Sequence, residues 1–589
     1  MNNIKRIINK LNYLKEWFAL LGVLGQLGVV TVFGFLVVLV SALFVGSIEN
    51  SYLLFIDPPA LPLMKDKPIT LLFSFLLMLF GLVVTGFIIS VLSSSLENTF
   101  RDIRMGRLKY LGENHTLIIN YNHKVMKILQ EINLLHSDNR DLHDVVILIN
   151  DDTNIEKLQS DIEKHHFNNL HIFVRFGDCL SWQRYEEISI LNIHSIIILS
   201  YEEIDDTFIR DNNNLRIVNL LFSNEKFLNY LKNKRDGKKP IKAIVEFTDI
   251  HHFDKIIDNT TQKLFLALAP TKILSNILNL SMINLDFYIT WSQLLSFDGY
   301  EFYFIEAKKH NLSNTNYKDI LLRHKNGLLI GISRFIDGEF KFLLNAQKES
   351  ILKDDWLIFI SENIYKIDFL KEVPKFQSKL HIEQPSEVFI RNVAIIGNKR
   401  TIQTNELLDI NESYIKNIDY SLEELFEKIS YEKLLNRNNE DSIIYDTIIL
   451  NLDDELIYRI VLNLRVMFNE KEINKFVFLI DDALVAQHLE TAGFKNTILS
   501  HLLISKYMAQ ISNQISLHKV FNILFVKDGP EINFINPTIL SSNLMELKYE
   551  LINNNMLYLG IITMDDKVLF ESNHLDNVKK IIVLSNGDR

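Results

Sequence analysis

The sequence predicts an α-helical membrane module of two spans, followed by two Rossmann-like α/β domains. Two charge-free apolar runs predict the membrane module. Residues 17–48 and residues 68–96 contain no Asp, Glu, Lys or Arg, and each run exceeds the roughly 20 residues that cross a bilayer. The α/β domains are predicted by apolar strand-like runs that alternate with helical patterns through the remaining chain, in an order that occurs twice.

Composition limits the class of the 589-residue chain. A net charge of −11 argues against a general role in binding nucleic acid, so we expect no nucleic-acid partner. The single cysteine, Cys179, excludes an intrachain disulfide and fits a reducing compartment. The first apolar run is much longer than the core of a signal peptide, which has about 7–15 residues, so we interpret it as a retained span.

Basic residues flank the outer ends of both spans and predict the orientation. The interspan loop holds only Lys65 and Lys67 as basic residues. The outer flanks hold Lys5, Arg6, Lys10, Lys15, Arg101, Arg104, Arg107 and Lys109. The positive-inside rule therefore places residues 1–16, and everything after the second span, in the cytoplasm of a bacterial-type inner or plasma membrane.

The polar interruption at residues 49–67 allows two interpretations. Residues 51–56 are apolar and aromatic, and Asp57-Pro58-Pro59 follows them. One interpretation is an external loop with a Pro-Pro turn. The other is a re-entrant pore helix that leads into a selectivity filter at Ile56, Asp57, Pro58, Pro59 and Ala60. Asp57 would then form a carboxylate ring in an oligomer, which favours cations.

Gly81 and Gly86 lie in the second span, where small residues allow either close helix packing or a gating hinge. Residues 17–98 therefore form the candidate pore module. Residues 99–113 form a basic, helical connector that could transmit force to the second span.

Strands and helices alternate after the connector. Continuous Ile, Leu and Val strands separated by helices are typical of a parallel sheet that is covered on both faces. We expect strands at 115–120, 144–150, 170–175, 195–200 and 241–247, and helices at 124–135, 154–165, 182–191 and 211–223. These elements make residues 114–250 a Rossmann-like lobe, and residues 251–372 follow as a helical hairpin and a β-rich lobe.

Enzyme motifs are missing from the sequence. The first strand is followed by Asn120-Tyr121-Asn122-His123-Lys124, without the glycines that dinucleotide binding needs, so nucleotide binding in the usual pose is disfavoured. There is no G-x-S-x-G, Walker A, C-x-x-C or H-E-x-x-H motif. The pairs His165-His166 and His251-His252 are poor joint metal ligands, because adjacent side chains point in different directions. We therefore expect that the protein is not an enzyme. A nucleotide-dependent oxidoreductase is the weakest of the functional hypotheses.

Polar residues at predicted strand ends are the ligand-binding candidates, because Rossmann-like folds bind ligands at the carboxyl ends of their strands. The candidates are Asn122, Asp151, Asp178, Glu246, Asp249 and Asp481. Their oxygens would suit Ca²⁺ or a monovalent cation in these domains. The alternative is that these residues are solvated starts of loops.

A second copy occupies residues 388–589, after a linker at residues 373–387 that holds Pro374 and Pro385. Its pattern repeats that of the first copy, but its Rossmann-like lobe is shorter. Residues 447–451 parallel 195–200, residues 475–481 parallel 242–248, residues 498–501 echo 273–276, and residues 528–532 echo 298–302.

Several stretches resemble the Castor/Pollux ion channels, which carry paired regulator-of-potassium-conductance (RCK, TrkA-N-like) domains. The resemblance covers about residues 51–535 and rests on residues 106–109 with 113–119, on 175–180, on 206–216 and on 297–301. It implies a two-span pore subunit with tandem RCK domains, and a homotetramer whose eight domains form a gating ring. Plant members have four spans, and simpler relatives carry D-P-G where this chain has Asp57-Pro58-Pro59.

The resemblance leads to a functional expectation. We expect a ligand-gated channel for cations, K⁺ and/or Ca²⁺, in which binding to the ring pulls the connector and opens a tetrameric pore. The alternative is a non-conducting, membrane-anchored regulatory or sensor subunit, which the loss of the filter glycine favours.

Overall fold

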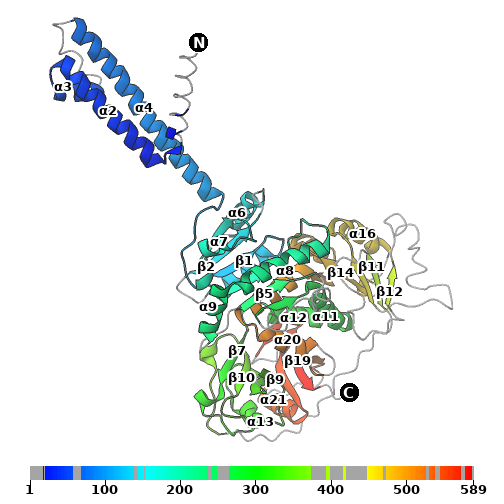
Figure 1. Ribbon diagram of the computed structural model, residues 1–589. Helices are drawn as coiled ribbons and strands as arrows, with labels where there is room; N and C mark the ends of the chain where they lie inside the picture. Colours follow the sequence, from blue (N-terminus) through cyan, green and yellow to red (C-terminus); the bar gives the residue numbers. More distant parts are fainter. Residues whose placement is uncertain are drawn as a thin grey trace. The chain divides into compact units, whose positions relative to one another are not determined.

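The computed structural model describes residues 13, 17–18, 20–56, 68–137, 142–150, 153–235, 242–248, 264–337, 339–372, 393–397, 415–418, 447–467, 473–525, 529–537, 544–571 and 577–586. The chain divides into two compact units, Met1–Leu108 and Lys109–Arg589, which are described separately (Figure 1). The expected linker at residues 373–387 lies outside the described residues.

The first unit consists of the helices α2 (Val23–Val45), α3 (Ile48–Ile56) and α4 (Pro68–Arg104). The segments Val23–Val45 and Leu71–Ile103 are long and apolar enough to cross a membrane. Helix α2 ends because Gly46 adopts φ 82°, and its N–H donates to Ala42 O at 2.8 Å. Helix α2 therefore ends near the end of the first apolar run, whereas α4 continues through the predicted start of the connector.

A parallel sheet forms the first Rossmann-like lobe, with strand order β3-β2-β1-β4-β5-β6. Its strands are β1 (Thr116–Ile119), β2 (His143–Ile149), β3 (Leu170–Phe176), β4 (Ser195–Ile198), β5 (Lys242–Glu246) and β6 (Leu266–Leu268). Its helices are α5 (Val125–Leu135), α6 (Thr153–His165), α7 (Trp182–Glu187), η2 (Ile190–Asn192), α8 (Thr207–Ser223) and α9 (Glu225–Arg235). The doubly wound fold predicted from the alternating pattern is confirmed.

The two faces of this sheet bury alternate residues of each strand, as the pleat requires. Leu117 and Ile119 of β1 lie in one core with residues of α7, α8 and α9. Ile118 lies in the other core, with residues of α5 and of a helix from the second copy. The apolar run of β1 is therefore buried on both faces.

A helical hairpin and an antiparallel sheet complete the first copy. The hairpin is α11 (Pro270–Ile283) and α12 (Asp286–Leu294), and the sheet has the order β7-β10-β8-β9. Its elements are β7 (Glu301–Glu306), η3 (Ala307–His310), α13 (Tyr317–Arg323), β8 (Leu328–Ile336), β9 (Glu339–Leu344), β10 (Trp356–Ser361) and η4 (Ile364–Lys366).

The second copy repeats this plan with a smaller first sheet. Its parallel sheet has the order β12-β11-β13-β14-β15, and its antiparallel sheet has the order β16-β19-β17-β18. Its strands are β11 (Val393–Gly397), β12 (Ile415–Ile418), β13 (Thr447–Asn451), β14 (Phe476–Ile480), β15 (Thr497–Leu499), β16 (Pro530–Ile535), β17 (Met556–Thr563), β18 (Val568–Phe570) and β19 (Val578–Asn586). Its helices are α16 (Asp454–Met467), α18 (Ala483–Thr491), α19 (Ser500–Asn513), α20 (Leu517–Phe525) and α21 (Leu544–Asn553).

The matching strand orders of the two antiparallel sheets support the internal duplication. One predicted echo is out of register. Ile273 lies inside helix α11, whereas Ile498 lies in strand β15. The short sequence Ile-Leu-Ser recurs in both copies, but the elements that correspond are α11 and α19, each of which follows the last strand of its parallel sheet.

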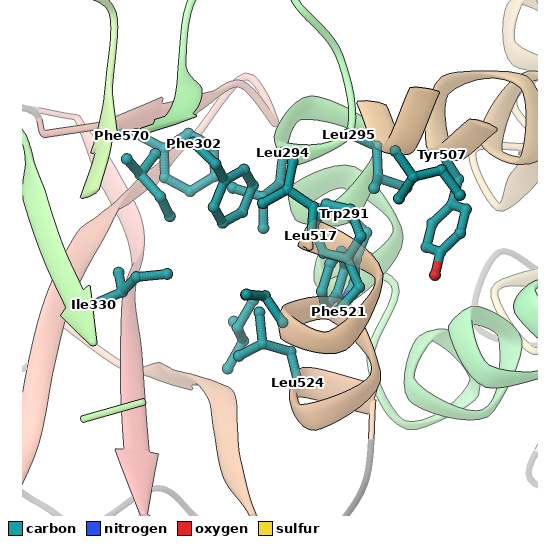
Figure 2. Close-up of a cluster of buried hydrophobic side chains, with 14 of the residues drawn as sticks. Trp291, Leu294, Leu295, Phe302, Ile330, Tyr507, Leu517, Phe521, Leu524 and Phe570 are labelled. Carbon is teal, nitrogen blue, oxygen red and sulfur yellow. The ribbon is translucent and has the colours of Figure 1, made fainter. Parts of the chain in front are cut away.

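A continuous core joins the two copies. Trp291 of α12 is fully buried, and its ring centroid lies 4.5 Å from that of Phe525 and 6.0 Å from that of Phe521, both on α20. Figure 2 shows Trp291 and Phe521 side by side, with Phe302 and Phe570 contributed by the β-rich lobes. Helix α19 packs on α5, β4 and β5. The second copy therefore completes the core of the first.

Candidate functional site

The short helix α3 is packed against both long helices of the first unit. A methyl group at Gly34 of α2 would lie 3.1 Å from Cζ of Phe55. A Cβ at Gly81 of α4 would overlap the carbonyl oxygen of Phe55. Both glycines therefore permit a close approach of α3, which is the packing role considered for Gly81. A Cβ at Gly86 would meet nothing within 4 Å, so Gly86 stays the clearer hinge candidate.

Helix α3 ends where the filter was predicted. Ile56 is its last residue and is 56% exposed. Asp57, Pro58, Pro59 and Ala60 lie outside the described residues. The helical form of residues 48–56, packed against two apolar helices, fits a re-entrant pore helix better than an extended external loop. The filter itself stays a prediction.

In the second unit, the carboxyl edge of the first sheet begins at the turn between β1 and α5. Asn120 adopts φ 70°, the conformation that glycine favours, and its Nδ2 donates to Leu199 O at 2.9 Å. Asn122 Nδ2 donates to Ser200 O at 3.0 Å, while its Oδ1 accepts the N–H of Lys124 at 3.0 Å. Two amide side chains therefore tie this turn to the end of β4, in the space where a dinucleotide fold uses glycines.

The last residue of this turn, Lys124, has a buried ammonium group. Lys124 is 3% exposed, and its Nζ lies 2.8 Å from Glu202 Oε1 and 3.1 Å from Glu246 Oε1. Burial alone would lower the pKa of Lys124, but the charges of Glu246 and Glu202 raise it above its ordinary value. Burial opposes ionisation of Glu202, yet hydrogen bonding and charge from His123 and Lys124 lower its pKa to about 2. These groups are therefore charged at neutral pH.

The second copy extends this network. The His501 ring of α19 stacks on the His123 ring with centroids 3.5 Å apart, and His501 Nε2 lies 3.2 Å from Asp481 Oδ1. Burial, and then the charges of His123 and Lys124, lower the pKa of His501 to about 3. Burial raises the pKa of Asp481. We call Asn122, His123, Lys124, Glu202, Glu246, Asp481 and His501 the edge cluster. It links the two copies through side chains.

The structure brings together three of the six predicted ligand residues. Asn122, Glu246 and Asp481 come together in the edge cluster. Asp178 does not join them, because its Oδ1 accepts the N–H of Leu180 at 2.8 Å in an exposed turn. Asp151 and Asp249 lie outside the described residues.

Four members of the edge cluster were not among the predicted ligand residues: His123, Lys124, Glu202 and His501. Glu202 could have been found, since the pair Glu202-Glu203 follows a predicted strand. Lys124 gave little signal, because lysine is usually solvated and its ion pairs join residues that are far apart in sequence.

The donor set of the edge cluster does not suit a bound cation. Within the part of the chain that the structure describes, no three His, Cys, Asp or Glu side chains are grouped to hold a metal ion. The two carboxylates that would serve as hard ligands already contact the ammonium of Lys124. The predicted cation site therefore stays a prediction, and two of its predicted carboxylates, Asp151 and Asp249, lie outside the described residues.

Known proteins resemble this chain in two ways. Residues 283–376, from α12 through the first β-rich lobe, match the family described as Castor and Pollux, part of voltage-gated ion channel. The probable ion channel POLLUX of Arabidopsis thaliana is 20% identical over 286 residues, which is 48% of this chain and 32% of that protein. The probable ion channel CASTOR of Oryza sativa subsp. japonica is 21% identical over 292 residues, or 48% of this chain and 30% of that protein. The match spans about a third of these relatives' length, and it confirms the predicted resemblance.

A solved gating ring shares the fold. The human SLO3 gating ring has a TM-score of 0.50 and 11% identity, and the match covers 81% of this chain and all of that one. The GsuK channel covers 96% of this chain and 97% of its own, with 12% identity and a TM-score of 0.41. The predicted fold class, two apolar helices followed by paired Rossmann-like domains of the gating-ring type, is confirmed.

Proposed function

Because the chain is related to the Castor/Pollux ion channels, we propose that it is a ligand-gated cation channel with a cytoplasmic gating ring. The observation that carries this proposal is one chain in which two apolar helices, with α3 packed between them, precede a duplicated gating-ring fold. The proposed assembly is a homotetramer with both termini in the cytoplasm. The permeant ions are K⁺, Ca²⁺ or both, and no reaction is catalysed.

Helix α4 supports the proposed coupling. It runs without interruption from Pro68 to Arg104, so a displacement at its cytoplasmic end would reach the membrane segment. Moving a gate from 1:99 to 99:1 takes about 5.5 kcal/mol of differential binding. Shared by eight domains, this is about 0.7 kcal/mol each, below a typical coupling free energy. We propose that the edge cluster transmits a conformational change from one copy to the other, because its side chains come from both copies.

Single-channel recording from purified protein in planar bilayers tests conduction. We expect unitary currents carried by K⁺ or Ca²⁺, and we expect Asp57→Asn to reduce the conductance, because Asp57 would place a carboxylate ring in the pore. Glu113→Gln, a change outside the pore module, is the control. Silence under K⁺ and Ca²⁺, each supplied to the cytoplasmic side of verified tetramers, would contradict the proposal.

The second candidate is a non-conducting sensor subunit anchored by two helices. It is favoured by Pro58-Pro59, which follow the predicted filter acid where simpler relatives carry a glycine. Replacing Pro59 by glycine distinguishes the candidates. If the wild type carries no current and the Pro59→Gly variant does, the protein has a pore that its filter closes. If neither protein carries current, the result favours the sensor.

A further inference from the structure

The amino-terminal edge of the first sheet gathers four histidines. His115 and His194 directly precede β1 and β4, His143 begins β2, and His136 follows α5. The rings of His136 and His143 stack with centroids 4.2 Å apart, and His194 lies edge-on to His143 at 6.2 Å. Neighbouring parallel strands begin at the same edge, which is why residues distant in sequence meet here. We call these four residues the histidine cluster.

Hydroxyl groups of two strands fix the ring of His143. Thr116 Oγ1 lies 3.0 Å from His143 Nε2 and 3.1 Å from Ser195 Oγ. The main chain is tied at the same place, because the N–H of His194 donates to His115 O at 2.8 Å. A disturbance of His143 would therefore reach both β1 and β4.

Two members of the histidine cluster are buried, and His136 and His194 are half-buried. His115 is fully buried and His143 is 9% exposed. Burial, and then the neighbouring imidazoles of His136 and His194, lower the pKa of His143 to about 3, while burial lowers the pKa of His115 to about 4. Burial also lowers the pKa of His136. These three imidazoles are therefore neutral at pH 7.

The surrounding titratable groups give a proton little compensation. Among the described residues, the end of the connector next to β1 carries Lys109, Tyr110 and Glu113, and the elements packed here carry Asp144, His171, Arg175, Arg184 and Glu187. Asp144 is shared, since it accepts the hydroxyl of Tyr110 at 2.6 Å and lies 3.3 Å from His171 Nδ1. Glu187 is paired with Arg184 at 2.8 Å.

The connector docks at this edge through Tyr110. The Tyr110 ring lies 4.8 Å from that of His115 and 5.0 Å from that of Phe173. Its N–H donates to Glu187 O at 2.8 Å, and its carbonyl accepts the hydroxyl of Ser189 at 2.8 Å. A Cβ on Gly112 would overlap the Tyr110 hydroxyl. The side chain of Tyr110 therefore occupies a fitted place beside His115.

We propose that the histidine cluster is an acid-sensitive latch, which holds Tyr110 when the cytoplasm is neutral and releases the connector when protons enter. Among the described residues, a protonated His143 would face His136, His194 and His115, and the carboxylate that offsets its charge is that of Asp144, which Tyr110 and His171 already contact. The open edge, where imidazoles are solvated, accepts protons more readily, so falling pH favours opening. Docking is a property of the sensor and is measured without current; only its effect on gating rests on the proposed function.

Hydrogen exchange followed by mass spectrometry tests the latch in the full-length protein in detergent. Labelling at about pH 7.5 and about pH 5.5 is compared after scaling times to the intrinsic exchange rate. For peptides covering residues 109–119, we expect acid to weaken protection about tenfold for each buried histidine that is freed to bind a proton. Peptides covering β17 serve as an internal reference and should keep their protection.

Two variants separate the latch from general acid damage. His143→Gln should reduce the acid effect about tenfold, because one titrating group is removed. His136→Phe keeps an aromatic ring against His143 but removes a group that can bind a proton. This variant decides the test if His143→Gln loses protection along its whole length at neutral pH. His488→Gln, on the exposed surface of α18, is the control and should behave as wild type.

Three outcomes would overturn the latch. In the first, the protection of residues 109–119 in the wild type differs by less than about twofold between the two pH values. In the second, acid weakens the protection of β17 as much as that of residues 109–119. In the third, the folded variants show the same acid effect as the wild type. Acid release in a protein that carries no current would keep the latch and reject the channel, so the two proposals fail separately.

Discussion

The two edges of the first Rossmann-like sheet hold buried ionisable groups in opposite ways. At the carboxyl edge, Lys124 is charged and lies within 3.1 Å of carboxylates of both Glu202 and Glu246. At the amino edge, His115 and His143 are buried with no carboxylate of their own among the described residues, and they stay neutral. Burial disfavours the charged form of a group at both edges. At one edge ion pairs offset this free energy, and at the other the groups stay uncharged. The ion pairs of Lys124 should therefore resist mild acid, whereas the neutral histidines should not.

Removing the ammonium is expected to have the largest effect. Lys124→Met leaves Glu246 and Glu202 without their partner, and breaking a buried ion pair in this way costs about 3–5 kcal/mol of unfolding free energy. Urea unfolding followed by circular dichroism measures the loss. Lys226→Met is the matched control, because its pair with Glu186 is exposed and should contribute less than about 1 kcal/mol.

The double variant Lys124→Met with Glu246→Gln sharpens this result. It removes the uncompensated charge that the single variant creates, so it should be more stable than Lys124→Met alone. If both losses simply added, the ion pair would not be the source of the stability.

Mild acid should destabilise the amino edge through its buried histidines. The folded pKa values of His143 and His115, about 3 and about 4, lie below the ordinary value of 6.5, so their contribution is present above pH 6.5 and is lost as pH falls. At about pH 5 each should cost about 2 kcal/mol of unfolding free energy. Glu202 begins to lose its contribution only below its ordinary value of 4.5, since its folded pKa is about 2.

Unfolding free energies measured at several pH values between about 7.5 and 5 check this window. His143→Gln should flatten the slope, while Lys226→Met, at an exposed ion pair, should leave it unchanged. A wild-type curve that is flat down to about pH 5 would show that the two edges do not differ.

The sequence predicted the fold better than it predicted the site. Continuous apolar strands alternating with helices were sufficient for both Rossmann-like lobes, because that pattern is local. The edge cluster and the histidine cluster are not local. Asn122, Glu246 and Asp481 could be predicted one at a time as strand-end residues, but their partner Lys124 resembles a solvated helix start. His115, His136, His143 and His194 meet only because β1, β2 and β4 begin side by side.

Tyr110→Phe should have a smaller effect than mild acid. It removes the hydrogen bond from the hydroxyl to Asp144 and keeps the ring against His115, so we expect a loss of about 1–2 kcal/mol. Hydrogen exchange of residues 109–119 at neutral pH should rise, and exchange elsewhere should not. Tyr365→Phe, at a side chain that is 93% exposed, is the control. An unchanged protection factor in Tyr110→Phe would mean that the connector is held by its main chain alone.

Asp178 offers the smallest expected effect, because it lies in an exposed turn and belongs to neither cluster. Asp178→Asn should keep the turn and change the unfolding free energy by less than about 0.5 kcal/mol. It should also leave any response to Ca²⁺ or K⁺ unaltered. A clear loss of cation response in this variant would restore Asp178 as a ligand residue.

The shared core has a consequence for biosynthesis. Trp291 and its neighbours on α12 are covered by Phe521 and Phe525, which the ribosome adds only after the parallel sheet of the second copy. Domains usually fold as units while synthesis continues, the amino-terminal one first. Here the first copy must wait with an apolar face uncovered until α19 and α20 emerge. The nascent protein is therefore expected to depend on chaperones for longer than its modular sequence implies, and premature termination in the second copy should yield an insoluble first copy.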